Sequence, residues 1–242
     1  MAFDPKQQIV DDLLKELPIG GEVEVNLPSK NFCYKLIDPS KPITIRPMTF
    51  EDEKLIASSK GKSDPIGVIL SRCVTNIQVH ELFPVDKLFL LLKLREISYG
   101  DEYNCSIGCP YCSTDNKLKV NLSELPVIYA EEGMTDKVEV DLPVIKRKML
   151  VRLPRSKDEP YLSDLEKISS NLWRFIEKID NYDDKVIISK VIEKLPVKDI
   201  KTITNALKMD IGVQTKISID CAACKKGSTH ELPITSSFFD VN

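Results

Sequence analysis

Residues 103–120 read YNCSIGCPYCSTDNKLKV, and residues 216–231 read KISIDCAACKKGSTHE. In each stretch a CxxC pair stands between two strand-like segments and is followed by a polar turn. This order is typical of a zinc knuckle, in which a tight turn brings two thiolates to one point. Two knuckles supply the four thiolates that tetrahedral zinc requires. We therefore predict one structural zinc site, with the ligands Cys109, Cys112, Cys221 and Cys224.

Two other interpretations of these cysteines remain open. The zinc site requires that the 108 residues between Cys112 and Cys221 fold so that the two hairpins meet. A redox-active CxxC would instead need an exposed helix N-terminus that lowers the pKa of one thiol. Unliganded cysteines are the third interpretation. Because each CxxC pair is predicted to lie in a hairpin rather than at a helix N-terminus, we favour the zinc site. Within the zinc interpretation, Cys105 paired with Cys109 is an alternative choice of ligands.

The remaining cysteines and the histidines have simpler interpretations. The N-terminus lacks the basic and apolar regions of a secretory signal, so we expect an intracellular, reducing compartment. There, closely spaced cysteines are more often metal ligands or redox centres than disulfides, and seven is an odd count. Cys33 and Cys73 are isolated, and we expect both to be packed core thiols. We expect His230 to be a surface strand residue rather than a ligand.

The composition argues against several functional classes. In 242 residues, 34 basic and 37 acidic side chains give a net charge of −3, which excludes a generally basic nucleic-acid coat. With nine glycines and no dinucleotide-binding or P-loop pattern, nothing indicates a nucleotide site. The most apolar run, Leu88–Leu92, is far shorter than the roughly 20 residues that cross a bilayer. We expect no enzymatic activity, no membrane contact and no small-molecule substrate.

Hydrophobic periodicity predicts an α+β fold. Helices are predicted at 5–17, 84–99, 161–179, 183–195 and 197–209, and two more begin at Thr49 and at Ser63 or Asp64. Strands are predicted at 22–27, 43–46, 117–122, 137–142, 148–153, 214–220 and 231–234.

These elements suggest three regions. We divide the chain into an N-terminal amphipathic helix (1–20) and two α+β halves (21–130 and 131–242), each with one knuckle; the halves can also form one compact domain. The best linker candidate is 123–136. The first helix either covers the core, which we favour, or serves as a partner-binding arm.

The two halves also resemble each other in sequence. Four short patterns of the first half recur in the second in the same order, with offsets of 115, 106, 112 and 107 residues: Val23–Pro28, Arg46 with Asp52–Glu53, Cys109–Cys112 and Glu124–Val127. Conserved order with modest drift is typical of a decayed duplication. Chance recurrence of short strand-and-proline patterns is the alternative. The predicted fold class is therefore α+β, with two duplicated halves joined by a zinc-ribbon-like four-cysteine site.

One dense basic stretch is present, and it has two interpretations. Its members are Lys146, Arg147, Lys148, Arg152, Arg155 and Lys157. Phosphate contact would make the chain a zinc-ribbon nucleic-acid-binding module. We favour instead the solvated face of the strand 148–153 and its loops, because no aromatic side chains are interleaved with these charges.

A further set of motifs carries a family resemblance. The motifs are VNLPS at 25–29, ITIRPMTFEDE at 43–53, REISYG at 95–100 and CPYC at 109–112, and the chain ends with ELPIT and a Phe–Phe pair at 238–239. Over roughly residues 20–125 this succession resembles the T4-like phage baseplate hub assembly proteins.

The resemblance implies a non-enzymatic protein of a contractile-tailed phage. The implied role is in baseplate hub assembly, as an assembly factor or chaperone or as a minor hub component. The implied partners are baseplate hub and tail proteins, and the implied location is the host cytoplasm during assembly or the baseplate of the virion tail. The zinc prediction rests on the cysteine spacing and not on the family.

Overall fold

The computed structural model describes residues 5–16, 21–58, 64–234 and 236–239. It combines helices and strands, so the α+β class is confirmed. Its helices are α1 Pro5–Glu16, α2 Phe50–Ser58, α3 Pro65–Cys73, α4 Pro84–Tyr99, α5 Leu165–Asn171, α6 Lys185–Ile192 and α7 Val197–Ala206. Its strands are β1 Val23–Glu24, β2 Thr44–Ile45, β3 Glu102–Gly108, β4 Asp115–Asn121, β5 Val127–Ile128, β6 Lys137–Asp141, β7 Lys148–Arg152, β8 Ile176–Ile179, β9 Gly212–Val213, β10 Lys216–Asp220 and β11 Gly227–Glu231.

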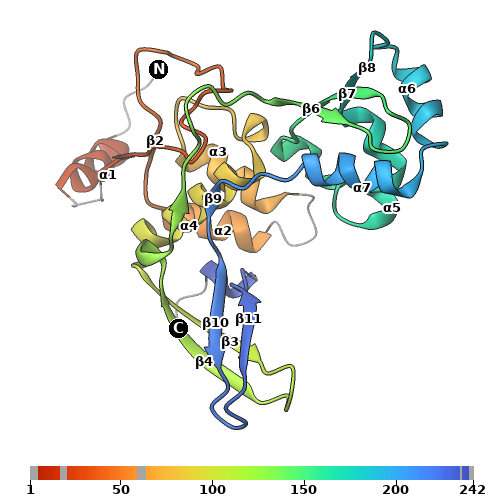
Figure 1. Cartoon of the computed structure of the whole chain (residues 1–242). Coiled ribbons are helices and arrows are strands. Elements are labelled where there is room, and N and C mark those ends of the chain that lie inside the picture. The colour runs from red at the N-terminus through yellow and green to blue at the C-terminus, as the bar shows by residue number, and fades with distance from the viewer. Residues whose placement is uncertain (1–4, 17–20, 59–63, 235, 240–242) are drawn as a thin grey trace.

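Figure 1 shows three parts: a body around α2, α3 and α4, a lobe that holds β6, β7, β8 and the helices α5 to α7, and an arm formed by two hairpins. None of the helices in the described ranges is long and apolar enough to cross a membrane.

The body is built around α4, which the sequence predicts with the same bounds. Pro84 opens the helix, where its missing N–H costs no hydrogen bond, and Gly100 ends it with a φ of 90°. Leu90 and Leu94 are fully buried against α3 and the short β1–β2 pair. Helix α4 therefore forms the centre of the body on which the arm also rests.

The lobe contains the antiparallel sheet β6–β7–β8, with helices packed against it. Here the predicted helix 161–179 is only partly right, because the α-helix covers Leu165–Asn171 alone. After Asn171 the chain forms a short 3-10 helix, and residues 176–179 form β8, which pairs with β7. Ile176 and Ile179 are both buried, and pairing with β7 satisfies the backbone hydrogen bonds of this segment.

The last strand and the first helix also differ from expectation. The last strand is β11 at 227–231 rather than 231–234, because the turn before it closes at Lys225, whose φ is 60°. The described apolar side chains of the first helix do not cover the core: Ile9 is 60% exposed and Leu13 61%. The predicted end of that helix at Leu17 lies outside the described residues.

The arm consists of the hairpins β3–β4 and β10–β11, which are both antiparallel. At its base Tyr103 of the first hairpin and Leu122, which follows that hairpin, pack with Leu232, which follows the second, and with Leu91 of α4. The Tyr103 hydroxyl also donates to the carbonyl of Pro233, at 2.6 Å. The base of the arm therefore holds the two hairpins together on the body.

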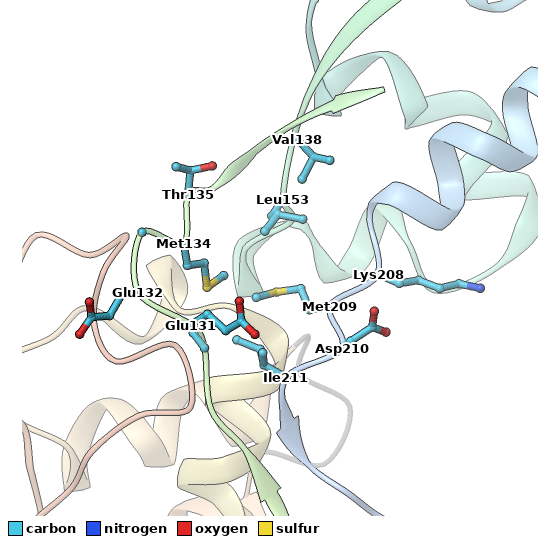
Figure 2. Close-up of a pocket in the computed structure, with 12 residues that line it drawn as sticks. Glu131, Glu132, Met134, Thr135, Val138, Leu153, Lys208, Met209, Asp210 and Ile211 are labelled. Atoms are coloured by element: carbon cyan, nitrogen blue, oxygen red, sulfur yellow. The ribbon is translucent and has the colours of Figure 1, made fainter. Parts of the chain in front are cut away.

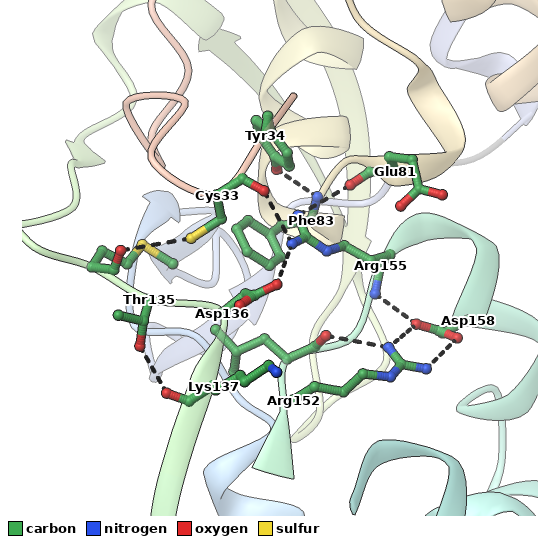
Figure 3. Close-up of polar contacts among 12 residues, drawn as sticks. Cys33, Tyr34, Glu81, Phe83, Thr135, Asp136, Lys137, Arg152, Arg155 and Asp158 are labelled. Carbon is green, nitrogen blue, oxygen red and sulfur yellow. Dashed lines mark hydrogen bonds and ion pairs between the residues drawn. The ribbon is translucent and has the colours of Figure 1, made fainter. Parts of the chain in front are cut away.

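Arg155 connects the lobe to the body (Figure 3). Its guanidinium donates to the carbonyls of Cys33 and Glu81, both at 3.2 Å, and to the carboxylate of Asp136 at 2.8 Å. It also lies 4.1 Å from the centre of the Phe83 ring. We expected Arg155 on a solvated face. Its side chain is instead nearly buried, because the guanidinium donates hydrogen bonds to two backbone carbonyls of the body.

The other charges of the basic stretch divide into two groups. Lys146 and Lys148 are exposed, as expected. The remaining three are paired within the chain, with Arg147 2.9 Å from Asp180, Arg152 2.7 Å from Asp158 and Lys157 2.6 Å from Glu81. The stretch therefore offers fewer free cations than its sequence suggests.

One arrangement occurs in both halves, 106 residues apart. Arg46 follows β2 and donates to the carboxylate of Asp52 at 2.8 Å. Arg152 ends β7 and donates to the carboxylate of Asp158 at 2.7 Å. Each arginine also donates to the carbonyl of the residue that follows it. The two contacts match the positions that the sequence repeat pairs.

A second matched contact was not anticipated. The backbone N–H of Ser29 donates to buried Asp86, near the start of α4, at 3.1 Å. The N–H of Val144 donates to buried Asp199, near the start of α7, at 2.8 Å. In both halves, a Leu–Pro dipeptide precedes the donor, and a buried aspartate in the first turn of a helix fixes the chain after the strand.

Candidate metal centre

The same turn occurs twice at the tip of the arm. In the first hairpin the N–H of Cys109 donates to Thr114, and the N–H of Ser113 returns to the carbonyl of Cys109, both at 2.9 Å. In the second, Cys221 N–H donates to Lys226 at 3.1 Å, and Lys225 N–H to Cys221 at 3.0 Å. Ser113 and Lys225 have left-handed φ values of 59° and 60°.

The four predicted ligands converge. Cys109 Sγ lies 3.7 Å from Cys224 Sγ, and Cys112 Sγ lies 3.6 Å from Cys221 Sγ. All four sulfurs are within 4.8 Å of one another. A tetrahedron with zinc–sulfur bonds of about 2.3 Å has edges of about 3.8 Å. The spacing therefore fits four thiolates around a single ion. Each of the two short sulfur–sulfur contacts joins a cysteine of one knuckle to a cysteine of the other.

The electrostatics of the thiols differ among the four. Backbone N–H groups of Cys224 and Ala223 lower the pKa of Cys221 to about 6. The pKa of Cys112 is lowered by the hydroxyl and N–H of Thr114. The N–H of Lys226 favours the thiolate of Cys224, but burial and the neighbouring thiols outweigh it and raise the pKa of Cys224 to about 11. A dication would displace the remaining protons, since metal-bound cysteine is a thiolate.

Asn116 is a site residue that the sequence reasoning missed. Its Oδ1 accepts the N–H of Ala222 at 2.9 Å, and its Nδ2 donates to Thr114 at 3.1 Å and to Ile107 at 3.3 Å. This buried side chain therefore joins the two turns that carry the cysteines. The only signal in the sequence is its place after the polar residues 113–115, where an asparagine is typical of an ordinary turn.

The other cysteines and His230 lie elsewhere. Cys105 pairs with Leu118 within the hairpin β3–β4, so the alternative ligand set with Cys109 is not formed. Cys73 is buried in the core of the body, as expected, whereas Cys33 is only half-buried. His230 lies in β11, where it contacts Ser228 at 2.8 Å, as expected for a strand residue.

One side of the site faces solvent. The Cys112 side chain is exposed, in contrast to the buried Cys109 and Cys221. Next to it Tyr111 is 58% exposed, and the Lys226 ammonium lies 4.9 Å from the centre of its ring. A four-sulfur set with no further ligand position is suited to structure rather than catalysis.

The comparisons with known proteins were made on the whole chain. A family model described as T4 bacteriophage base plate protein matches residues 24–240. The match includes both halves and all four clustered cysteines. Neither a curated protein nor a solved structure matches the chain.

Proposed function

The chain belongs to the T4 bacteriophage base plate protein family, and from this membership we propose that it acts in assembly of the baseplate hub. The role is that of an assembly factor or chaperone, or of a minor hub component, in the host cytoplasm and on the forming tail. It operates through protein–protein contacts and has no catalytic step. Supporting this proposal, the motifs from VNLPS to CPYC that resemble hub assembly proteins lie inside the matched region.

We propose that the four cysteines hold a structural zinc ion. Supporting this are the sulfur spacing, the two identical turns and the shared brace of Asn116. Cys109, Cys112, Cys221 and Cys224 would provide the ligands, and the bound ion would cross-link the hairpins. Because an unfolded chain rarely holds a preformed site, the free energy of metal binding would add directly to the free energy of folding.

We also propose that the two halves arose by duplication. The matched contacts of Arg46 with Asp52 and of Arg152 with Asp158 support this, as do those of Asp86 and Asp199. Chance recurrence of short sequence patterns would not reproduce the same hydrogen bonds at the paired positions. The four-cysteine site would then be a pseudo-symmetric junction to which each half contributes one knuckle.

The structure gives little support to the alternative function, a zinc-ribbon module that binds nucleic acid. A phosphate-binding strip needs cations that are free to meet phosphates. Arg147, Arg152 and Lys157 are each paired with a carboxylate of the chain, and Arg155 is enclosed between lobe and body. We therefore retain protein–protein contact as the proposed mode of action.

The proposal is tested by phage that lack the gene, complemented from a plasmid. Loss of the protein should leave contractile tails absent or without a central hub in electron micrographs, and wild-type protein should restore them. Mass spectrometry of purified virions then separates a hub component, which stays in the particle, from an assembly factor, which does not. Normal tails and normal infectivity without the protein would contradict a role in hub assembly.

A further inference from the structure

Lobe and body meet where one turn of the body accepts a segment of the lobe. The Ser156 N–H donates to the carbonyl of Leu82 at 2.7 Å, and the Ser156 hydroxyl donates to the same carbonyl at 3.1 Å. Lys157 lies 2.6 Å from the carboxylate of Glu81. Leu82 and Phe83 are fully buried. We call residues 81–83 the acceptor turn of the body and residues 156–157 the donor segment of the lobe.

The lobe has an acceptor turn of its own. Residues 194–196 precede α7 as residues 81–83 precede α4, in the register that matches Asp199 with Asp86. The N–H of the middle residue, Leu82 or Leu195, donates to the carbonyl three residues earlier, at 3.2 and 3.1 Å. In both turns the last carbonyl accepts the N–H groups of the residues three and four positions later. The two backbones are therefore equivalent.

The acceptor turn of the lobe is open. Leu195 and Pro196 are only half-buried, Lys194 is exposed, and Val197, which follows, is 71% exposed. In the part of the chain that the structure describes, no N–H donates to the Leu195 carbonyl and no carboxylate pairs with Lys194. The lobe therefore leaves uncovered the same surface that the body covers with the donor segment.

The body, in turn, has an unused donor segment. The matched contacts of Arg46 and Arg152 place Phe50 and Glu51 where the lobe has residues 156–157. Phe50 begins α2 and is 70% exposed, and N–H groups in the first turn of a helix have no partner within it. Over the described ranges no carbonyl accepts the Phe50 N–H. One free donor segment and one free acceptor turn thus remain on each chain.

We propose that the acceptor turn of the lobe binds the donor segment of a second copy of this chain, so that copies associate head to tail. The Phe50 N–H of one copy donates to the Leu195 carbonyl of the next, and the Phe50 ring lies against Val197. Glu51 pairs with Lys194. Such a heterologous contact builds a closed ring or an open chain of copies. The inference rests on the matched contacts of the two halves and not on the proposed role in the hub.

The contact has to form between copies rather than within one. From the end of α7 the chain runs toward β9 and the body (Figure 1). The acceptor turn at the other end of α7 therefore lies on the side of the lobe away from the body, which holds α2.

The charges select this pairing. Within one chain, acidic Glu81 of the acceptor turn pairs with basic Lys157 of the donor segment. In the two free partners both signs are reversed, because the turn carries Lys194 and the segment carries Glu51, which is 80% exposed beside Arg72. The pair therefore stays attractive between copies, whereas Lys157 would meet Lys194 as a like charge.

The contact between copies is weaker than the one within the chain. Thr49 stands where the lobe has Arg155, so the guanidinium contacts with the body have no counterpart. Lys87 of the body pairs with Glu159 at 2.7 Å, and Ile200 stands at the matching position of the lobe. The association is therefore reversible and depends on concentration.

The test is sedimentation velocity of the purified full-length protein over a range of concentrations. Glu51→Lys and Lys194→Glu each reverse one charge of the proposed pair, and an equimolar mixture of the two variants brings opposite charges together again. Phe50→Ala changes no charge and removes the apolar contact. The matched control is Lys208→Glu, at the opposite end of α7, where the ammonium is exposed and points away from the pocket that its neighbours line (Figure 2).

We expect wild type and the control to self-associate as the concentration rises. Each charge reversal, and Phe50→Ala, should weaken the association by about tenfold or more, and the mixture of the two charge variants should restore it. A wild-type protein that stays monomeric at every concentration, association that survives both charge reversals, or a mixture that associates no better than its components would overturn the inference. Because only this protein is present, the outcome does not depend on the proposed role in the hub.

Discussion

The N–H of Ala222 donates to the side-chain oxygen of Asn116 at 2.9 Å, so a residue of the first knuckle hairpin supports the backbone of the second. The same asparagine donates to Thr114 within its own turn. Asn116 therefore fixes the relative position of the two CxxC pairs independently of the sulfurs. Residues that orient the ligands of a metal site typically change its metal affinity 10- to 100-fold when they are replaced.

Replacing this brace should weaken metal binding without removing a ligand. We expect Asn116→Ala to lower the zinc affinity about 10- to 100-fold, measured by competition with a chromogenic chelator. Asn121→Ala provides the control, because Asn121 lies in the same strand and, among the described residues, its side-chain amide donates only to Glu124, at 3.0 Å. Equal affinity of wild type and Asn116→Ala would show that Asn116 does not support the site.

Loss of a ligand should remove both metal and stability. We expect Cys112→Ser and Cys224→Ser to lose stoichiometric zinc, measured by elemental analysis, and to melt at a lower temperature than wild type. Cys105→Ser should keep its zinc, because Cys105 lies outside the cluster. If all three variants contain the same zinc as wild type, the four cysteines do not form a shared site.

Arg155 should contribute more stability than an arginine on the surface. Arg155→Ala leaves the carbonyls of Cys33 and Glu81 without their donor, and we expect a loss of about 2–4 kcal/mol in the free energy of unfolding. Arg147→Ala breaks only a surface ion pair with Asp180 and should cost under about 1 kcal/mol. Urea denaturation measures both, and equal losses would contradict the proposed connection between lobe and body.

Asp52 and Asp158, which accept hydrogen bonds from Arg46 and Arg152, should contribute to stability with the same dependence on pH. Burial raises the pKa of Asp52, but hydrogen bonds from Arg46, Thr49 and Arg72 outweigh it, and the pKa is held well below the usual 3.8. The pKa of Asp158 is also lowered, because the hydrogen bonds from Arg152 and the N–H of Arg155 outweigh the effect of burial.

A lowered pKa in the folded state gives stability that is complete above the unfolded pKa and is lost as the pH falls below it. Asp52→Asn and Asp158→Asn should each destabilise the protein by about 3 kcal/mol at pH 7. The difference from wild type should narrow below pH 3.8, in urea titrations repeated at each pH. A difference that stays constant with pH, in either variant, would contradict the ionised pairing of that carboxylate.

The sequence predicted which four cysteines cluster, because the spacing of the two CxxC pairs constrains the turns that carry them. A CxxC followed by a polar turn allows few backbone paths, and both pairs of cysteines lie in the hairpins expected from that pattern. Helix α4 was also predicted with its bounds, since Pro84 and Gly100 mark its ends. Such local signals do not depend on what packs nearby.

Features set by distant contacts were not predictable in this way. Residues 176–179 have a helical pattern but form β8, because the edge of β7 pairs with them. Asn116 and Arg155 have polar side chains typical of a turn and a surface, and only the folded chain shows their buried partners. The sequence also did not reveal that Asp86 and Asp199 make similar contacts. Their hydrogen bonds match, but the residues around them in the sequence do not match closely.

The separation of the two knuckles has a consequence during synthesis. Cys109 and Cys112 leave the ribosome long before Cys221 and Cys224, so the hairpin β3–β4 can form while two of the four clustered cysteines have not yet been synthesised. Bringing these distant segments together is a late, entropically costly event. The tip of the arm is thus completed only after translation has passed Cys224, and a ribosome that stops before that codon releases a chain with an unfinished arm.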